Sequence, residues 1–327
     1  MFKLLLRHVP LFAMLFACLS LSACKDADEW NTLRLEQMLA ENSEPSVGST
    51  AYFCNHPLPV GRKQLRVLAI GNSYTVDAIT YVKDILAAAD IEEDSYSVYY
   101  VAHEAATLQH WWEQAEQETE LTLYHACGAQ MPLKEGTMAQ LLAQQWDVIS
   151  LQQYSDDSVD YTTYNPWLRQ LIDFIQQYCP NPDVTLAWQM PWSYNDRIVP
   201  YMPNYTRWLF IANATQTMLI EDGVNVIIPV GTAIQNGRRS VLNTAGQLTR
   251  DGWHLDYGIG RYIAACTWVE TLFGPVYGFS VEGNSALPDM GDHPQKRFVS
   301  QPVTEENRPI AWKCAREAVV HPFKIME

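Results

Sequence analysis

Five short apolar runs, most of them followed by a segment of helical character, limit the folds open to this chain. The clearest run is 147–151, whose nearly continuous apolar character is typical of a parallel strand covered on both faces. Strands that alternate with helices pair in parallel through right-handed crossovers. The sequence therefore predicts an α/β fold of flavodoxin-like type, with three α/β/α layers and a five-stranded parallel sheet. The other predicted strands are 65–70, 96–101, 184–188 and 224–229.

Apolar residues at helical spacing predict the helices between these strands and after them. Two segments fall outside the alternation. One is a short strand at 121–125 that ends in a turn at Gly128, and the other is 231–235, which we interpret as a wall of the crevice. The predicted helices are 79–88, 107–118, 137–145, 167–178, 207–220, 258–273 and 305–318.

The first 23 residues have the features of a targeting segment. Lys3 and Arg7 flank an apolar core that is short for a membrane span, and small residues precede Cys24. This resembles a bacterial lipoprotein signal peptide with its lipobox, which implies cleavage before Cys24 and lipidation of its thiol. We therefore expect a protein of the cell envelope, anchored to a membrane through the lipid on Cys24, with the outer membrane or the cell surface as its location.

After this segment the chain predicts one large domain with two extensions. Residues 24–63 are expected to form a tether and an N-terminal strap, 64–274 the α/β domain, and 275–327 a C-terminal extension packed on the same domain. Removal of Lys3 and Arg7 with the targeting segment changes the formal net charge from −15 to −17. This charge disfavours nucleic acid as a partner, because its binding depends on Lys and Arg contacts to phosphate. The oligomeric state is left open.

The cysteines and histidines lack the spacing of a metal site. None of the five cysteines after Cys24 forms a Cys-x-x-Cys pair, and no histidine cluster has zinc-ligand spacing. We therefore expect no structural metal, and the chemistry expected below needs neither a metal nor an organic cofactor. A disulfide between Cys54 and Cys314, one in each extension, is a hypothesis only, because spacing does not reveal connectivity.

The Gly-Asn-Ser turn at 71–73 follows the first strand and precedes a helical pattern. In open α/β sheets, ligands bind beyond the carboxyl ends of the strands, so Ser73 lies where chemistry is expected. The alternative is that Ser73 merely caps the helix. A serine hydroxyl is a poor nucleophile near neutral pH, and it needs a base within hydrogen-bond reach and a third group that orients the base.

Asp251 and His254 supply such a pair immediately before the last large helix. Their spacing of three places both side chains on one side of a single turn, so the carboxylate can hold Nδ1 while Nε2 faces a neighbouring hydroxyl. The alternative reading is an ordinary Asp-Gly turn beside a partly buried histidine.

Together, the serine after the first strand and Asp-x-x-His before the C-terminal helix resemble the SGNH (GDSL-like) hydrolase superfamily, as a divergent bacterial lipoprotein branch. Gly71-Asn72-Ser73 stands where that family has Gly-Asp-Ser, and the likeness covers roughly 65–273. The resemblance implies that Ser73 is the nucleophile, His254 the general base and acid, and Asp251 the carboxylate that orients His254.

The middle blocks depart from the family pattern. The family builds its oxyanion hole from the N–H of the nucleophile, a glycine N–H after the second strand and an Asn side chain after the third. Here the second block, 102–108, has no glycine, so we expect the N–H of Ala105 or Ala106 at negative φ beside that of Ser73. An amide from Gln152 or Gln153 replaces the asparagine, and the sequence does not choose between them.

Aromatic residues follow several strand ends, and four of them are expected to line the substrate. Aromatic faces stack on sugar rings, although each of these residues has packing as its alternative role. Two other residues near the second block, His103 and His110, lack a carboxylate at short fixed spacing, and we interpret both as solvated or structural. The four expected lining residues are Tyr74, Trp188, Trp192 and Trp253.

The sequence thus predicts a serine ester hydrolase that forms an acyl-enzyme. By analogy more than derivation, the substrate is an O-acetylated carbohydrate of extracellular glycans. Two alternatives are a non-catalytic glycan-binding lipoprotein on a hydrolase scaffold, and a lipase or thioesterase that takes longer acyl groups.

Overall fold

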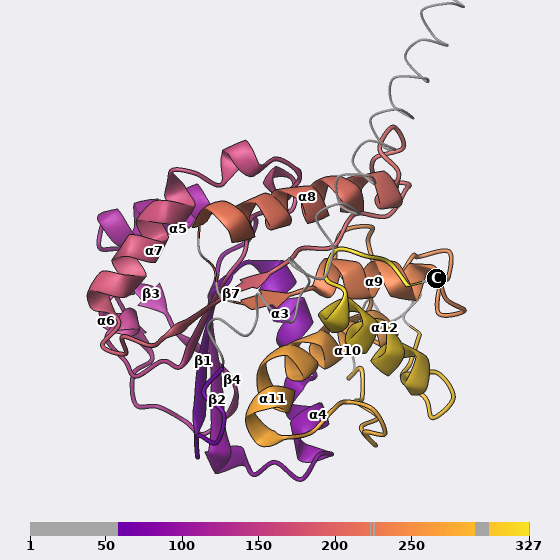
Figure 1. Ribbon diagram of the computed structural model, residues 1–327, viewed down its shortest axis with the longest axis horizontal. Helices are drawn as coiled ribbons and strands as arrows, with labels where there is room; N and C mark the ends of the chain where they lie inside the picture. The colour runs from indigo at the N-terminus through magenta and orange to yellow at the C-terminus, as the bar shows by residue number, and fades with distance from the viewer. Residues whose placement is uncertain (1–57, 223, 225, 292–300, 327) are drawn as a thin grey trace, which may run out of the picture.

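A six-stranded sheet forms the centre of the computed structural model, which describes residues 58–222, 224, 226–291 and 301–326. Its strand order is β4-β2-β1-β6-β7-β8. Figure 1 labels β1, β2, β4 and β7 of this sheet near the middle of the molecule. All pairings from β2 across to β8 are parallel, which confirms the predicted α/β class. The parallel strands are β1 (Leu65–Gly71), β2 (Tyr96–Ala102), β6 (Val148–Leu151), β7 (Thr185–Gln189) and β8 (Val226–Ile228).

The remaining strand, β4 (Tyr124–Gly128), is antiparallel to β2 and forms one edge of the sheet. The predicted five-stranded, all-parallel sheet is therefore wrong at this edge. An edge strand gives a weak apolar signal because one face meets solvent; Tyr124 is exposed while Cys127 is buried. The separate pair β3 (Leu121–Thr122) and β5 (Glu135–Gly136) lies beside it.

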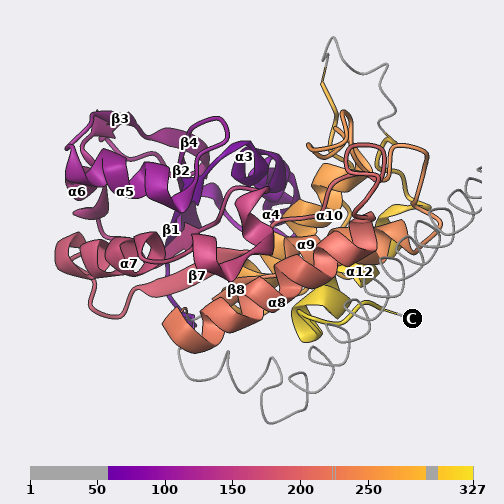
Figure 2. The same cartoon turned by 90° about the horizontal axis from the view of Figure 1, so that it is seen from above.

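The helices form two layers on the two faces of the sheet (Figure 2). One layer contains α3, α4, α9, α10 and α12, and the other contains α5, α6, α7 and α8. Their bounds are α3 (Ser73–Ile79), α4 (Val82–Ala87), α5 (Leu108–Glu116), α6 (Met138–Leu142), α7 (Trp167–Tyr178), α8 (Asn204–Asp222), α9 (Val230–Arg238), α10 (Ile259–Trp268), α11 (Gly274–Tyr277) and α12 (Arg308–Val320).

Strand β1 shows why the sheet needs both layers. Val67 and Ala69 belong to the apolar core beneath α3 and α10, whereas Leu68 and Ile70 belong to the core beneath α5 and α7. Successive side chains of a strand point to opposite faces, so a continuous apolar run must be covered twice.

Three helical segments differ from the prediction. The segment 79–88 belongs to two short helices, α3 and α4, and α3 begins at Ser73 itself. Residues 231–235 lie inside α9 instead of forming an irregular crevice wall. The long helix 258–273 consists of α10 followed by a π-helical turn, η4 (Val269–Phe273).

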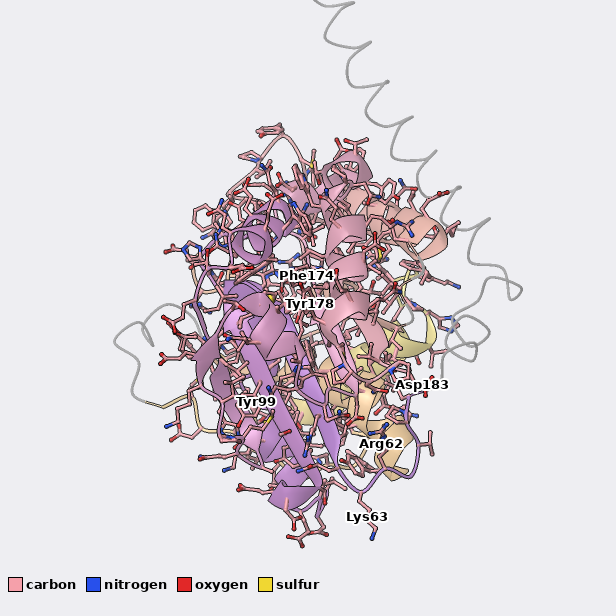
Figure 3. All side chains as sticks on the ribbon, turned by 90° about the vertical axis from the view of Figure 1, so that its left-hand side faces the viewer. Arg62, Lys63, Tyr99, Phe174, Tyr178 and Asp183 are labelled. Carbon is pink, nitrogen blue, oxygen red and sulfur yellow. The ribbon has the colours of Figure 1, made fainter. Side chains whose placement is uncertain are left out.

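The C-terminal helix α12 packs against α9 and α10. The targeting segment, Cys24, Cys54 and most of the strap lie outside the described residues, and Cys314 is buried. Among the helices that are described, none is both long and apolar enough to cross a bilayer. Figure 3 labels Arg62 and Lys63 at the end of the sheet where β1 begins, so the site described next lies at the opposite end.

Candidate active site

Ser73 lies at the junction of β1 and α3, at the carboxyl edge of the sheet. It is the first residue of α3 and is partly exposed. The helix cap is the preceding residue, because the side chain of Asn72 accepts a hydrogen bond from the N–H of Tyr74 at 3.0 Å. The Ser73 hydroxyl is therefore not needed as the cap.

The side chains of Ser73, His254 and Asp251 form one continuous hydrogen-bonded relay. Ser73 Oγ lies 2.9 Å from His254 Nε2, and His254 Nδ1 lies 2.6 Å from Asp251 Oδ2. With the Nδ1 proton donated to the carboxylate, Nε2 is left to accept the serine proton. The three residues that the sequence placed together are thus brought together in space.

Asp251 is held as an anion by the turn it begins. Its Oδ1 accepts the backbone N–H groups of Trp253 at 2.9 Å and His254 at 2.7 Å. Burial alone would raise the pKa of Asp251, but the hydrogen bonds from the His254 ring and these two N–H groups lower that pKa to about 2. The carboxylate is consequently ionised throughout the pH range in which an imidazole titrates.

A second aspartate, Asp77, fixes this turn to the helix that carries Ser73. Its buried carboxylate accepts two bonds from Arg250 Nη1, at 3.0 and 2.9 Å, and one from the N–H of Leu255 at 2.9 Å. Arg261 also donates to Asp77, from Nε at 2.9 Å and from Nη2 at 2.6 Å. Arg250 and Leu255 flank the Asp251–His254 turn, so Asp77 holds both of its ends.

The segment after β7 supports the same turn from its other side. The indole of Trp192 donates to the carbonyl of Trp253 at 2.7 Å and stacks on the ring of Tyr74, with centroids 3.8 Å apart. Gly252 has φ +100°, and a Cβ there would lie 2.4 Å from a side-chain carbon of Ile198. Only glycine fits this position without a shift of the turn.

The backbone donors after β2 differ from the prediction. Ala105 has φ +54°, in the left-handed region that favours glycine, and not the negative φ that was expected. The N–H of Ala106 is already donated to the carbonyl of His103 at 3.2 Å, so the expectation that Ala106 supplies a free donor is wrong. The exposed Ala105 is the better candidate of the two.

The two glutamines after β6 have different roles. Gln153 faces away from Ser73: its Nε2 donates to the carbonyl and hydroxyl oxygens of Thr163, at 3.1 and 3.3 Å. Its Oε1 accepts the N–H of Leu108 at 3.0 Å, which ties β6 to the start of α5. The expectation that Gln153 donates to an oxyanion is therefore wrong.

Gln152 belongs to a buried polar network that reaches Asn72, the residue before Ser73. Its Nε2 donates to Asn72 Oδ1 at 2.7 Å, while its Oε1 accepts Thr75 Oγ1 at 2.5 Å and Gln189 Nε2 at 2.7 Å. Asn72 in turn donates to the carbonyl of Ala106 at 3.1 Å. This network joins the ends of β1, β6 and β7 to the segment after β2.

Three of the four aromatic residues expected to line the substrate are packing residues. Trp188 is fully buried with its ring 5.1 Å from Tyr164, and Tyr74 and Trp192 are buried against each other. The prediction is wrong for these three, because their side chains support the turn or fill the core. Trp253 is 41% exposed beside His254 and keeps its candidate role.

Asp77, Arg250, Arg261 and Gln189 were missed by the sequence reading. The sequence did contain a sign that Asp77 has a partner. Asp77 lies four residues after Ser73, one helical turn along, in an apolar stretch where an unpaired carboxylate would be costly. No local pattern pointed to the two arginines or to Gln189.

The sequence matches a family model described as Domain of unknown function (DUF4886) over residues 66–295. The chain belongs to this family. A crystal structure of a DUF4886 family protein from Bacteroides uniformis is similar to it, with a TM-score of 0.65 and 28% identity over 81% of this chain and 98% of that one. None of the curated proteins matches the sequence.

Less similar solved structures include a candidate SGNH hydrolase and an acetylxylan esterase, and their likeness to this DUF4886 chain concerns the fold alone. A candidate SGNH hydrolase from Slackia heliotrinireducens is 19% identical, with a TM-score of 0.45 over 64% of this chain and 98% of that one. A catalytic mutant of the acetylxylan esterase Axe2 from Geobacillus stearothermophilus is 13% identical, with a TM-score of 0.44 over 68% and 96% of the two chains.

Proposed function

We propose that this DUF4886 protein is a serine ester hydrolase that works through an acyl-enzyme on Ser73. The observation that carries the proposal is the relay from Ser73 Oγ to His254 Nε2, at 2.9 Å, and from His254 Nδ1 to Asp251, at 2.6 Å. These distances are those expected of an activated nucleophile and its oriented base. A helix-capping serine would need no such partners, and Asn72 already caps α3.

In the first half of the reaction, Ser73 Oγ bonds to the ester carbonyl carbon while its proton passes to His254 Nε2. The negative charge moves to the carbonyl oxygen, where the N–H groups of Ser73 and Ala105 are the proposed donors. Collapse of this intermediate breaks the bond to the alcohol oxygen, which takes the proton from His254. Asp251 stays ionised and stabilises the imidazolium.

In the second half, His254 takes a proton from water as the water oxygen bonds to the acyl carbon. The bond to Ser73 Oγ then breaks, Oγ recovers the proton, and the carboxylic acid leaves. The same base serves both halves, so loss of His254 removes both acylation and deacylation.

A fluorophosphonate probe tests this assignment directly. The protein should become labelled, and Ser73→Ala should not, because the probe bonds only to an activated serine hydroxyl. Equal labelling of the two proteins would refute the assignment of Ser73. A wild type that labels but hydrolyses neither vinyl acetate nor longer acyl esters would favour a binding protein on a hydrolase scaffold.

The finer proposal is that the substrate is an O-acetylated carbohydrate. Trp253, exposed beside His254, supports it, because an indole face can stack on a sugar ring. Release of acetate from acetylated glycans, with lower kcat/KM for butyryl and longer esters, would support it. The reverse preference would favour a lipase or thioesterase.

We also propose that the protein is a lipoprotein of the cell envelope. Support comes from Lys3, Arg7 and the small residues before Cys24, all of which precede the described residues. Metabolic labelling with a fatty-acid probe, lost in Cys24→Ala, tests this proposal independently of activity.

A further inference from the structure

Three buried amide side chains connect helix α10 to the residue before Ser73. The indole nitrogen of Trp268 on α10 donates to Gln189 Oε1 at 2.7 Å, and Gln189 Nε2 donates to Gln152 Oε1 at 2.7 Å. Gln152 Nε2 then donates to Asn72 Oδ1, also at 2.7 Å. We call Gln189, Gln152 and Asn72 the amide triplet; all three side chains and the indole are buried.

The donors at the two ends fix which way each amide of the triplet faces. An amide accepts at its oxygen and donates at its nitrogen, whereas an indole can only donate. Trp268 therefore requires the oxygen of Gln189 on its side, and the nitrogen of Gln189 faces Gln152. By the same rule, the nitrogen of Gln152 faces the oxygen of Asn72. That oxygen also accepts the N–H of Tyr74, so the nitrogen of Asn72 is left for the segment after β2.

The nitrogen of Asn72 provides one of two anchors for the segment after β2. Asn72 Nδ2 donates to the carbonyl of Ala106 at 3.1 Å, and the N–H of His103 donates to the carbonyl of Gly71 at 3.4 Å. Ala105 lies between the two anchors, is exposed, and donates its N–H to no group among the described residues. Both anchors attach to the two residues that precede the proposed nucleophile, so the position of Ala105 relative to it depends on both.

We propose that Asn72 is a positioning residue for the oxyanion donor, and that the amide triplet holds Asn72 in the orientation that this role requires. If the amide of Asn72 turned over, its oxygen would face the carbonyl of Ala106 and its nitrogen would face the N–H of Tyr74, and neither pair can form a hydrogen bond. The segment would then keep only the backbone anchor at His103. The assignment rests on the proposed ester hydrolysis, because the N–H of Ala105 serves as a donor only in that reaction.

The variant Asn72→Ser tests the positioning role. Serine keeps an oxygen that caps a helix about as well as asparagine does, but its side chain is too short to reach Ala106. We expect kcat for ester hydrolysis to fall about 10-fold to 100-fold with little change in KM, because the donor is misplaced for the transition state. Hydrogen exchange of the backbone amides of 103–106, followed by mass spectrometry, should become about threefold to tenfold faster, which corresponds to the loss of one hydrogen bond.

Asn284→Ser is the matched control. Asn284 is also buried and makes the same two kinds of bond, since it donates to the carbonyl of Ile85 at 2.9 Å and accepts the N–H of Ala286 at 3.0 Å. None of these three residues belongs to the site. The melting temperature of this variant should fall, while its kcat and the exchange of 103–106 should stay as in the wild type. An equal loss of kcat in the two variants would show a general effect of destabilisation and would overturn the proposal.

Gln189→Met tests whether the triplet sets the orientation of Asn72. Methionine has a similar length and makes neither hydrogen bond, and Gln189 itself bonds neither to the segment after β2 nor to Ser73. We expect kcat to fall about threefold to tenfold and the exchange of 103–106 to become faster. Trp268→Phe, which removes the indole donor and keeps an aromatic ring, replaces this variant if it does not fold. Unchanged kcat and exchange would overturn the role of the triplet.

The exchange measurement separates this proposal from the proposed function. A wild type that hydrolyses no ester would refute the proposed hydrolase, and the exchange of 103–106 in Asn72→Ser would still decide whether Asn72 holds the segment. Unchanged exchange in Asn72→Ser would overturn the positioning role whatever the activity.

Discussion

The turn that carries His254 and the segment that follows β2 lie at the same edge of the sheet, but they are held in different ways. The His254 turn is clamped by a buried carboxylate, Asp77, and by the Trp192 indole. The segment after β2 is held by two backbone hydrogen bonds, from His103 to Gly71 at 3.4 Å and from Ala106 to His103 at 3.2 Å, and by the Asn72 amide, which donates to Ala106 at 3.1 Å. It includes the exposed Ala105, which has positive φ. The proposed base is thus fixed by charge, and the proposed oxyanion donor by local backbone geometry.

The largest effect on activity should come from removing the proposed base, His254. His254→Ala is expected to lower kcat by on the order of 10⁴ to 10⁶, because a serine without its base is a weak nucleophile. Ester hydrolysis under saturating substrate measures this loss. An effect below tenfold would mean that Ser73 is activated by another group.

Asp77→Asn should affect both the stability of the protein and the position of His254. The buried Arg261 and the partly buried Arg250 lose their counter-charge, so the free energy of unfolding should fall by about 3–5 kcal/mol. Misplacement of His254 should lower kcat by about 10-fold to 100-fold with little change in KM. Urea denaturation and steady-state kinetics measure the two quantities.

Asp84→Asn on the neighbouring helix α4, where the carboxylate is exposed, is the control for Asp77→Asn and should change neither quantity appreciably. A change in KM alone for Asp77→Asn would argue against a positioning role for Asp77.

Asp256, which lies just after the His254 turn, should make the stability of the protein depend on pH. Burial raises the pKa of Asp256 from 3.8 to about 7, despite its bonds from the N–H groups of Gly258 and Gly260. A raised pKa in the folded state means that the folded protein binds this proton more tightly than the unfolded chain does. The contribution of Asp256 to the free energy of unfolding is therefore complete below its ordinary pKa of 3.8 and is lost as the pH rises through about 7.

Asp256→Asn cannot ionise and should remove that slope. Between about pH 4 and about pH 8, the free energy of unfolding of the wild type should fall relative to the variant by on the order of 1–4 kcal/mol. Chemical denaturation across this range measures the difference. Parallel curves would show that Asp256 stays ionised in the folded protein.

The smallest effect should come from a change in the segment after β2. Ala105→Gly relieves a left-handed conformation and should raise the free energy of unfolding by about 0.5–1 kcal/mol. The matched change Ala102→Gly, in the extended strand β2, should lower it by a similar amount. If both variants are destabilised equally, Ala105 is not strained.

The same contrast explains which parts of the site could be predicted from the sequence. Ser73, Asp251 and His254 were found because a nucleophile at a strand end and a carboxylate three residues from a histidine are local patterns. Asp77 and Arg261 were not found because their pairing depends on how α3 and α10 pack, which no short spacing records. The sequence could not reject Gln153 as a donor, because its side-chain direction after β6, where neighbours point to opposite faces, follows from the fold.

The fold shows a similar division. The buried parallel strands were predicted because a strand covered on both faces has a continuous apolar run. The short strand predicted at 121–125 was left outside the sheet, although β4 (Tyr124–Gly128) forms its antiparallel edge, because an edge strand is half polar. The helix α9 was missed because its apolar residues directly continue those of β8.

The distance along the chain between Ser73 and His254, 181 residues, has a consequence for how the protein acquires its chemistry. Contacts between segments so far apart form only after the intervening chain has been ordered, because closing a long loop costs entropy that local contacts do not. A chain still being synthesised or exported therefore carries Ser73 without its base. The proposed reactivity would arise only when the last third of the polypeptide has folded onto the first, so labelling by the probe would also report on completed folding.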